Sequence, residues 1–451
     1  MYFLYVVILL TTFQEAVLGF FGVSGISLFL LRTIADSSSI LLFFYAVTRN
    51  SLKNKAFTLS GNGYERVFMA FFIYSLIISL STLNSNLGTN IAEIIVLNRF
   101  VFLAMTVPMI VNTEPKIVRL LKFLSLIVLT QVIIGALQKI GGPQVIDFFR
   151  PNDYSNIITG SDRSFTSNRG LSRQMIIGTL GDFLTFGYIV FSGIIFLLAS
   201  RAWRLRTYLM LLILIVMVFL SGSRAIFLSS LLLVLFTAFM TAKPRIRLLI
   251  FLAALVGIPP SILFLINSAA GVEFEYSAFF AIFRPEFFQS LMNQRLGHAF
   301  LYLPLFVLQP EAIFGLSPDR MLATDFAITN FSTDLPYRFI ATFSETLEDF
   351  YPAALVTYYG LAGATLFYLM YVRIVLSAWR NRNHFNDLTA YLARLVLFFI
   401  ATAHLLSLAN QSFENRSFAL FLWVTVGMYV SKTLIDRRSP MQSYNEGNTV
   451  D

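Results

Sequence analysis

The sequence predicts an all-α polytopic integral membrane protein with about twelve transmembrane helices and one large loop on the external side. Hydrophobic residues make up 57% of its 451 residues and charged residues only 13%, against about 25% charged in an ordinary soluble domain. The chain also divides into many apolar stretches close to the roughly 20 residues that cross a bilayer as a helix. This composition excludes a soluble globular enzyme, a disordered chain and a nucleic-acid-binding protein.

Polar or basic connections separate the predicted helices, which in chain order are residues 2–20, 28–48, 66–83, 91–111, 117–137, 174–199, 207–222, 224–241, 247–268, 351–376, 391–410 and 417–434. The first has no basic stretch before its apolar run and no small-residue cleavage site. We therefore expect a retained helix and not a cleaved signal peptide. The seventh and eighth helices are separated only by the turn Ser221-Gly222-Ser223-Arg224.

Lys and Arg are concentrated in alternate connections, the pattern expected when basic loops stay in the cytoplasm. These connections hold Arg49, Lys53, Lys55 and Arg66; Lys116, Arg119 and Lys122; Arg201, Arg204 and Arg206; Lys243, Arg245 and Arg247; and Arg373, Arg380 and Arg382. Lys432, Arg437 and Arg438 extend the pattern toward the tail at 435–451. Both termini are therefore predicted to be cytoplasmic, and the net charge of +9 is attributed to topology and not to a polyanion partner.

The opposite side carries two long loops, and these divide the chain into its predicted parts. Residues 1–268 form the first group of helices and include a basic external loop at 138–173. Residues 269–350 form the large external loop, whose apolar stretches Phe279–Phe288 and Leu296–Leu308 are typical of interfacial amphipathic helices. Residues 351–434 hold the last helices. Loops longer than about 12–15 residues are usually functional or disordered, and neither loop is of low complexity.

Arginines on the external side are the candidates for binding an anion. Arg224 follows a Ser-Gly-Ser turn at the start of a predicted helix, where unpaired N–H groups and the helix dipole favour negative charge. A snorkelling arginine at the membrane surface is the alternative. Further candidates are Arg169 and Arg173 in the first loop, and Arg284, Arg295 and Arg338 in the second, which also contains Arg320. The planar guanidinium matches phosphate oxygens in pairs, although paired charges in a solvated loop would give the same composition.

The acidic residues Glu345, Glu348 and Asp349 come immediately before the predicted helix at 351–376. Their spacing places Glu345 on the same face as Glu348 or Asp349 if this stretch is helical. A carboxylate at an apolar boundary can act as a general base, whereas acidic residues at a helix start are also favoured by the helix dipole. His298, near Arg295, is a further candidate for contact with a substrate.

The ionisable residues predicted to lie within the membrane are Glu15, Arg32, Asp36, Glu93, Arg99, Asp182 and Arg394. Structural pairing is the default expectation for such groups, and Arg32 with Asp36 and Glu93 with Arg99 have suitable spacing. The sequence has no cysteine and three histidines far apart, which argues against a metal site. It has no nucleotide-binding or hydrolase motif. No cofactor and no metal are therefore expected.

Several short motifs occur in an order that resembles bacterial O-antigen polymerases and the related O-antigen ligases. They are the Ser221-Gly222-Ser223-Arg224 turn; Gly178-Thr179-Leu180-Gly181-Asp182-Phe183; Asn293-Gln294-Arg295-Leu296; Ile313-Phe314-Gly315-Leu316-Ser317-Pro318; and Glu348-Asp349-Phe350-Tyr351 followed by Tyr359-Gly360-Leu361-Ala362-Gly363. The motifs cover about residues 160–370, and the topology covers the rest. The ligases have a His-Asn pair where this chain has Glu348-Asp349, so the resemblance favours the polymerases.

The resemblance implies a C-type glycosyltransferase architecture in the bacterial inner membrane, with the active site facing the periplasm. Its substrates would be an undecaprenyl-diphosphate-linked oligosaccharide donor and acceptor, and a chain-length regulator would be a further protein partner. Arg224 and Arg295 would bind the leaving diphosphate, helped by residues among Arg169, Arg173, Arg284, Arg338 and Arg416. A carboxylate among Glu345, Glu348 and Asp349 would orient or deprotonate the acceptor, in an inverting transfer that needs neither metal nor nucleotide.

Two other functions stay open at this point. One is a ligase that transfers the glycan to a different acceptor, against which the missing histidine counts. The other is a flippase or exporter of lipid-linked sugars, which would need charged residues along a path between both faces. The intramembrane residues Glu15, Asp36, Glu93, Arg99 and Asp182 keep this possibility open, whereas the concentration of the remaining charge on one face favours surface chemistry.

Overall fold

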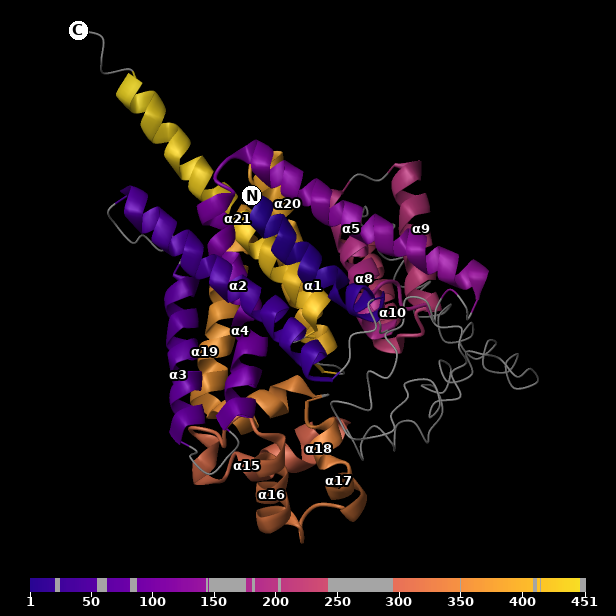
Figure 1. The fold of residues 1–451 in the computed structure, drawn as a ribbon, viewed down its shortest axis with the longest axis vertical. Coiled ribbons are helices and arrows are strands. Elements are labelled where there is room, and N and C mark those ends of the chain that lie inside the picture. The colour runs from indigo at the N-terminus through magenta and orange to yellow at the C-terminus, as the bar shows by residue number, and fades with distance from the viewer. Residues whose placement is uncertain are drawn as a thin grey trace. The chain divides into compact units, whose positions relative to one another are not determined.

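The computed structural model describes residues 1–20, 25–54, 63–81, 87–142, 145, 176–180, 183–201, 204–241, 295–348, 350–408, 412–413 and 415–446. These residues are helical wherever they form regular structure (Figure 1). The long helices are α1 (Tyr2–Phe20), α2 (Gly25–Asn54), α3 (Tyr64–Ser81), α4 (Leu87–Ile110), α5 (Glu114–Gly141), α8 (Phe183–Ser200), α9 (Leu205–Leu220), α10 (Arg224–Thr241), α19 (Tyr351–Asn381), α20 (Asp387–Ser407) and α21 (Arg416–Glu446).

The prediction of an all-α protein built from apolar helices is confirmed for the described residues. Each predicted membrane helix coincides with one of these helices, except the segment 247–268, which lies outside the described residues. Four helices, α5, α19, α20 and α21, are long and apolar enough to cross a membrane, and shorter apolar helices accompany them. The chain therefore has the character of a multi-pass membrane protein. The full number of spans and their sidedness stay predictions.

The chain forms two compact units, and the first contains both ends of the sequence. It comprises Met1–Gln14, Phe29–Ile127 and Gln294–Asp451. Within it α21 packs on α4 and α20, and α19 packs on α3 and α20 (Figure 1). In α21, 89% of the most apolar 18-residue stretch is buried inside the protein. This helix therefore forms the core of the unit. The large buried side chains of α21 include Trp423 and Tyr429.

The second unit comprises Glu15–Leu28 and Val128–Asn293, and its described helices α8, α9 and α10 pack on one another. Helix α8 begins at Phe183, whereas the predicted helix began at 174. Residues 178–180 form a turn, with Gly178 at φ 58°. The buried Gln138 accepts from the N–H groups of Ile177 (3.0 Å) and Gly178 (2.9 Å), and Gln131 accepts from that of Thr179 (3.0 Å). These side-chain bonds replace the helical ones, so the predicted helix start was wrong.

The turn between α9 and α10 lies where the sequence predicts it. Ser221 is fully buried, its hydroxyl donates to the Val218 carbonyl at 2.6 Å, and Gly222 has φ 74°. The N–H groups of Ser221 and Gly222 bond to carbonyls of the preceding turn at 3.1 and 2.9 Å. These two donors therefore serve the turn itself, and α10 begins at Arg224.

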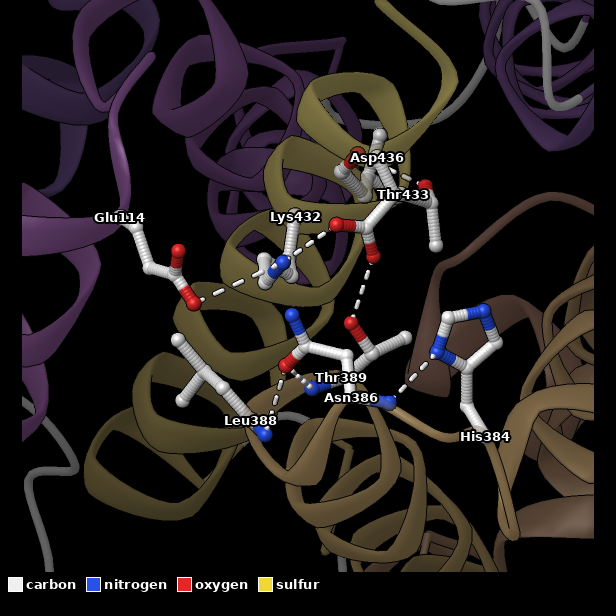
Figure 2. A network of polar contacts seen from close by, with 9 residues as sticks. Glu114, His384, Asn386, Leu388, Thr389, Lys432, Thr433 and Asp436 are labelled. Atoms are coloured by element: carbon white, nitrogen blue, oxygen red, sulfur yellow. Dashed lines mark hydrogen bonds and ion pairs between the residues drawn. The ribbon is translucent and has the colours of Figure 1, made fainter. Parts of the chain in front are cut away.

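A polar network holds α20, α21 and the start of α5 together within the first unit (Figure 2). Lys432 is 1% exposed and lies between Glu114, at 3.6 Å, and Asp436, with which it forms an ion pair. The Thr389 hydroxyl donates to the second oxygen of Asp436 at 2.6 Å. Lys432, which the charge pattern assigned to topology, is thus also a buried structural cation.

We expect Asp436→Ala to lower the free energy of unfolding by about 1–3 kcal/mol, because it leaves the buried ammonium of Lys432 without its nearest partner. The double variant Lys432→Met/Asp436→Leu removes both charges and is expected to recover most of that loss. Thermal unfolding of the purified variants in detergent measures both effects. If the single and double variants were equally unstable, the loss would come from packing and not from the unpaired charge.

The other intramembrane ionisable residues are only partly described. Arg99 is buried and its guanidinium lies 4.8 Å from the Phe100 ring centroid. Arg394 donates to the Arg382 carbonyl at 3.1 Å. The side chains of Glu15, Arg32, Asp36, Glu93 and Asp182 lie outside the described residues. The predicted Arg32–Asp36 and Glu93–Arg99 pairs therefore stay predictions.

Candidate functional site

Short helices between residues 295 and 350 gather at the end of α19 where Tyr351 lies (Figure 1). They are α14 (Arg295–Gly297), the π-helix η2 (His298–Tyr302), α15 (Leu303–Phe306), the 3₁₀ turn η3 (Pro310–Ala312), α16 (Arg320–Phe331), α17 (Tyr337–Ala341) and α18 (Phe343–Thr346). The helical character predicted for 296–308 is confirmed up to Phe306, with a π-helical turn in the middle. The other predicted stretch, 279–288, lies outside the described residues.

Glu348 lies between α18 and α19, and its carboxylate forms the centre of the candidate site. The Nε and Nη2 atoms of Arg320 each donate to one of its two oxygens. The Tyr358 hydroxyl donates to Oε1 at 3.0 Å. Because the Glu348 side chain is only 7% exposed, these charge-assisted bonds offset the loss of hydration that burial imposes on a carboxylate.

Arg320 is placed by the start of α16. The Asp319 side chain accepts from the N–H groups of Met321 (2.8 Å) and Leu322 (3.2 Å), which makes it the N-cap of this helix. Arg320 is therefore the first residue of α16. Its side chain stays 51% exposed, and the paired contact uses two of the five N–H donors of the guanidinium. The remaining donors can bind an anion that approaches from solvent.

Tyr358 is placed by an irregular stretch of α19. Gly360 has φ 65° and ψ −179° inside this helix, a backbone region that is essentially restricted to glycine. The Thr357 and Tyr358 carbonyls accept from the N–H groups of Leu316 (2.9 Å) and Ser317 (3.0 Å), which lie outside the helix. The residue that donates to Glu348 is therefore tied to the connection between η3 and α16.

His298 is fully buried on the π-helix, beside the rings of Phe339 and Phe343 at centroid distances of 4.7 and 4.9 Å. Its Nε2 lies 2.8 Å from the Thr346 hydroxyl, which itself donates to the Thr342 carbonyl at 2.9 Å. The direction of the bond between Nε2 and this hydroxyl depends on the tautomer of the imidazole. Nδ1 is buried and has no hydrogen-bond partner among the described residues.

Burial lowers the pKa of His298 from 6.5 to about 3. Above pH 6.5 His298 is neutral in both the folded and the unfolded state, so it does not lower the free energy of unfolding. Between pH 6.5 and about 3 the unfolded chain binds a proton that the folded protein does not, and the free energy of unfolding falls. At pH 5 this loss is about 2 kcal/mol.

Thermal unfolding at pH 7.5 and pH 5.0 tests this effect. We expect the wild type to lose more stability between the two pH values than His298→Gln, because glutamine does not titrate. His384→Gln makes the same replacement at a histidine that follows α19 at the far end of that helix, and it serves as the matched comparison. An equal loss in wild type and His298→Gln would contradict the expectation.

The structure describes the side chains of some predicted site residues, only the backbone of others, and none of the atoms of the rest. Glu348 is buried and its described ion pair is with Arg320, whereas Arg338 is exposed on α17. The backbones of Arg224, Arg295 and Glu345 are described, as the first residues of α10 and α14 and as part of α18, but their side chains are not. Asp349, Arg169, Arg173 and Arg284 lie outside the described residues. Their roles stay predictions.

Sequence reasoning missed two residues of the site. Arg320 was one of four arginines in its loop, and no spacing singled it out. Tyr358 lies in an apolar helix with a second tyrosine beside it, and only the neighbouring Gly360 marks the helix as irregular. Within the described ranges, no group of three or more His, Asp or Glu side chains could hold a metal ion.

No family model matches the chain, and no curated protein matches it either.

Proposed function

We propose that the protein is a polymerase of undecaprenyl-diphosphate-linked oligosaccharide repeat units for a bacterial surface polysaccharide. The observation that supports it best is the buried Glu348 carboxylate, bound by Arg320 and Tyr358 at the start of an apolar helix long enough to cross a membrane. A half-exposed arginine held at such a boundary suits a substrate whose diphosphate lies between a lipid tail and a water-soluble glycan. The proposal includes about twelve spans, cytoplasmic termini and a site on the periplasmic face of the inner membrane.

The reaction transfers the growing glycan from its lipid diphosphate to the acceptor repeat unit. The acceptor hydroxyl attacks the anomeric carbon, a carbon–oxygen bond forms with inversion, and the bond to the diphosphate oxygen breaks. The hydroxyl proton passes to a carboxylate, and the lipid diphosphate leaves with its negative charge. Fixed arginines can stabilise that charge as it develops, without a metal or nucleotide.

The contacts around Glu348 support a role for Arg320. Glu348 holds the guanidinium of Arg320 in place, and the Tyr358 hydroxyl in turn donates to Glu348, so we add Arg320 to the arginines proposed from the sequence as ligands of the diphosphate. Because both oxygens of Glu348 already accept from donors, its main role is to position Arg320. Glu345 and Asp349, its neighbours in sequence, are then the stronger candidates for orienting or deprotonating the acceptor hydroxyl.

Reconstitution tests the proposal directly. Purified protein in nanodiscs receives undecaprenyl-diphosphate-linked repeat units alone, with a chelator and without nucleotide, and the products are separated on a gel. A ladder of chain lengths is the expected result. If intact substrate and folded protein yield no ladder until lipid A core is added as acceptor, the protein is a ligase and the proposal is wrong.

A test in cells separates the polymerase from a flippase. Arg224→Ala with Arg295→Ala should remove long chains while single repeat units still reach the cell surface. A flippase defect would leave all repeat units on the cytoplasmic side, so single repeat units would disappear from the surface as well. That second result would contradict the proposed polymerase.

A further inference from the structure

Residues 313–317, which connect η3 to α16, cross α19 and α3 and are bonded to both. The Ile313 carbonyl accepts from the N–H of Ala362 at 3.1 Å. The Tyr74 hydroxyl of α3 lies 2.9 Å from the Phe314 carbonyl. Since α16 begins three residues after this segment, the crossing determines where that helix starts.

Ser317, the last residue of the crossing, has a backbone conformation that is unusual for a residue with a side chain. Its φ is 93°, in the region that favours glycine. Among the described residues, Arg201 is the other non-glycine residue with a positive φ, and it is exposed, whereas Ser317 is fully buried. Such conformations persist only where the surroundings over-determine them, and they cluster at functional sites.

Three hydrogen bonds hold Ser317 in this conformation. Its N–H donates to the Tyr358 carbonyl at 3.0 Å, and its own carbonyl accepts from the N–H of Asp319 at 2.8 Å. Its hydroxyl accepts from the side-chain amide of Asn90 at 2.9 Å, and Asn90 is itself fully buried in the first turn of α4. Ser317 is therefore bonded to α19, to the cap of α16 and to α4.

The bond to Asn90 is what serine adds at this position. Glycine would adopt φ 93° without strain, as Gly315 and Gly360 do at φ 87° and 65° nearby. Serine is strained there, but its hydroxyl connects the segment to α4. The side chain thus acts as an anchor, which the backbone conformation alone does not require.

The anchor belongs to a closed ring of contacts that contains Arg320. The carbonyl of Tyr358 binds Ser317, and the hydroxyl of the same tyrosine donates to Glu348 at 3.0 Å. Both oxygens of Glu348 accept from Arg320, which follows Ser317 by three residues. Ser317 therefore fixes the backbone on which Arg320 stands, and Glu348 fixes its guanidinium.

We propose that Ser317, anchored by Asn90, is a positioning residue for Arg320. It fixes the entry into α16, so that the guanidinium meets Glu348 with two donors and presents the others to an anion. Holding these donors in place before the anion arrives reduces the entropy lost on binding. That the anion is a lipid diphosphate rests on the proposed function, whereas the placement of Arg320 by Ser317 does not.

The reactivity of Arg320 measures its placement. Phenylglyoxal attacks the neutral form of an arginine side chain, so a guanidinium held by a carboxylate reacts slowly. The protein in nanodiscs is treated with the reagent, and the modification rate of Arg320 is followed by mass spectrometry relative to that of the exposed Arg338. The variants are Ser317→Gly and Asn90→Ala. Ser332→Gly, at the exposed C-cap of α16, is the matched control.

Both test variants are expected to raise the relative rate at Arg320 by about threefold or more, because the guanidinium leaves the ion pair more often. Ser332→Gly should leave the rate unchanged. The melting temperature of Ser317→Gly should stay within about 2 °C of the wild type, since relief of the strained φ offsets the lost bond. When Glu348→Gln has already removed the ion pair, adding Ser317→Gly should have little further effect.

Unchanged rates in Ser317→Gly and Asn90→Ala would overturn the proposal, and so would an equal rise in Ser332→Gly, which would show a general loosening of α16. If Ser317→Gly does not elute as a single peak on size exclusion, Asn90→Ala decides, because it leaves the backbone of the crossing unaltered. Each sample is also measured with undecaprenyl diphosphate. If this ligand protects Arg320 in no sample while the rates rise as expected, the positioning role stands and the proposed function loses Arg320 as a ligand.

Discussion

Arg320→Ala is expected to remove long-chain product and to destabilise the protein. The substitution removes the ion pair and the two hydrogen bonds from the guanidinium while the Glu348 carboxylate, 7% exposed, stays buried. Removing one partner of a fully buried ion pair costs about 3–5 kcal/mol, and since half of the Arg320 side chain is in solvent we expect about 1–3 kcal/mol here. Thermal unfolding and the reconstituted ladder measure the two effects separately.

Glu348→Gln is the informative companion of this variant. Glutamine keeps an oxygen that can accept from Tyr358, and the half-exposed guanidinium of Arg320 can be hydrated by water, so the loss of stability should be smaller than in Arg320→Ala. Product length should nevertheless fall, because Arg320 is no longer held in place. Arg380→Ala, at an exposed position near the other end of α19, is the control for removing a surface charge. If Glu348→Gln were the less stable of the two, the assignment of a buried carboxylate to this site would be refuted.

The second large effect is expected for Gly360→Ala, which should lower the free energy of unfolding by about 2 kcal/mol or more. The residue has φ 65°, where a side chain is strained, and an added Cβ would lie 2.4 Å from the Ile313 carbonyl oxygen. Backbone atoms on the opposing segment cannot move aside as a flexible side chain can. The crossing of 313–317 on α19 would have to open, and Tyr358 would move with it.

Gly63→Ala is the matched control for Gly360→Ala. Gly63 also has a positive φ, 77°, but the nearest atom to an added Cβ is the end of the Arg373 side chain at 3.9 Å. This variant therefore carries backbone strain without a clash. Melting temperatures in detergent should fall clearly more for Gly360→Ala than for Gly63→Ala. Equal shifts would show that the close approach of the two backbones adds nothing to the cost.

Much of the helical framework could be predicted because apolar run length and turn residues are local signals. The separate helices α9 and α10 follow from a turn of small residues between two apolar runs. The start of α8 was missed because Ile176 and Ile177 are apolar and buried, as in a helix. The turn is instead held by Gln131 and Gln138, some forty residues or more away. Bonds between residues so far apart in sequence cannot be predicted from local composition.

In the candidate site, too, one residue could be predicted from local sequence and its partners could not. Glu348 could be predicted because it comes just before an apolar run. Its partners could not, since Arg320 is 28 residues away and meets it only when α16 packs beside α18. The irregular geometry at Gly360 was also hidden, because the run from 351 to 376 reads as one continuous helix. It occurs where the backbone of residues 313–315, far away in sequence, passes close to Gly360.

The bond between Tyr74 and Phe314 has a consequence for how the protein is made. The two residues are 240 positions apart, and the chain between them includes nearly all of the second unit. At about 5–20 residues per second, the ribosome needs about 10–50 s to reach Phe314 after Tyr74. During that time α3 is already synthesised, but its partner α19 does not yet exist. The early helices of the first unit must therefore survive in the membrane as an incomplete assembly, open to membrane chaperones and quality-control proteases, until the last third of the chain is synthesised.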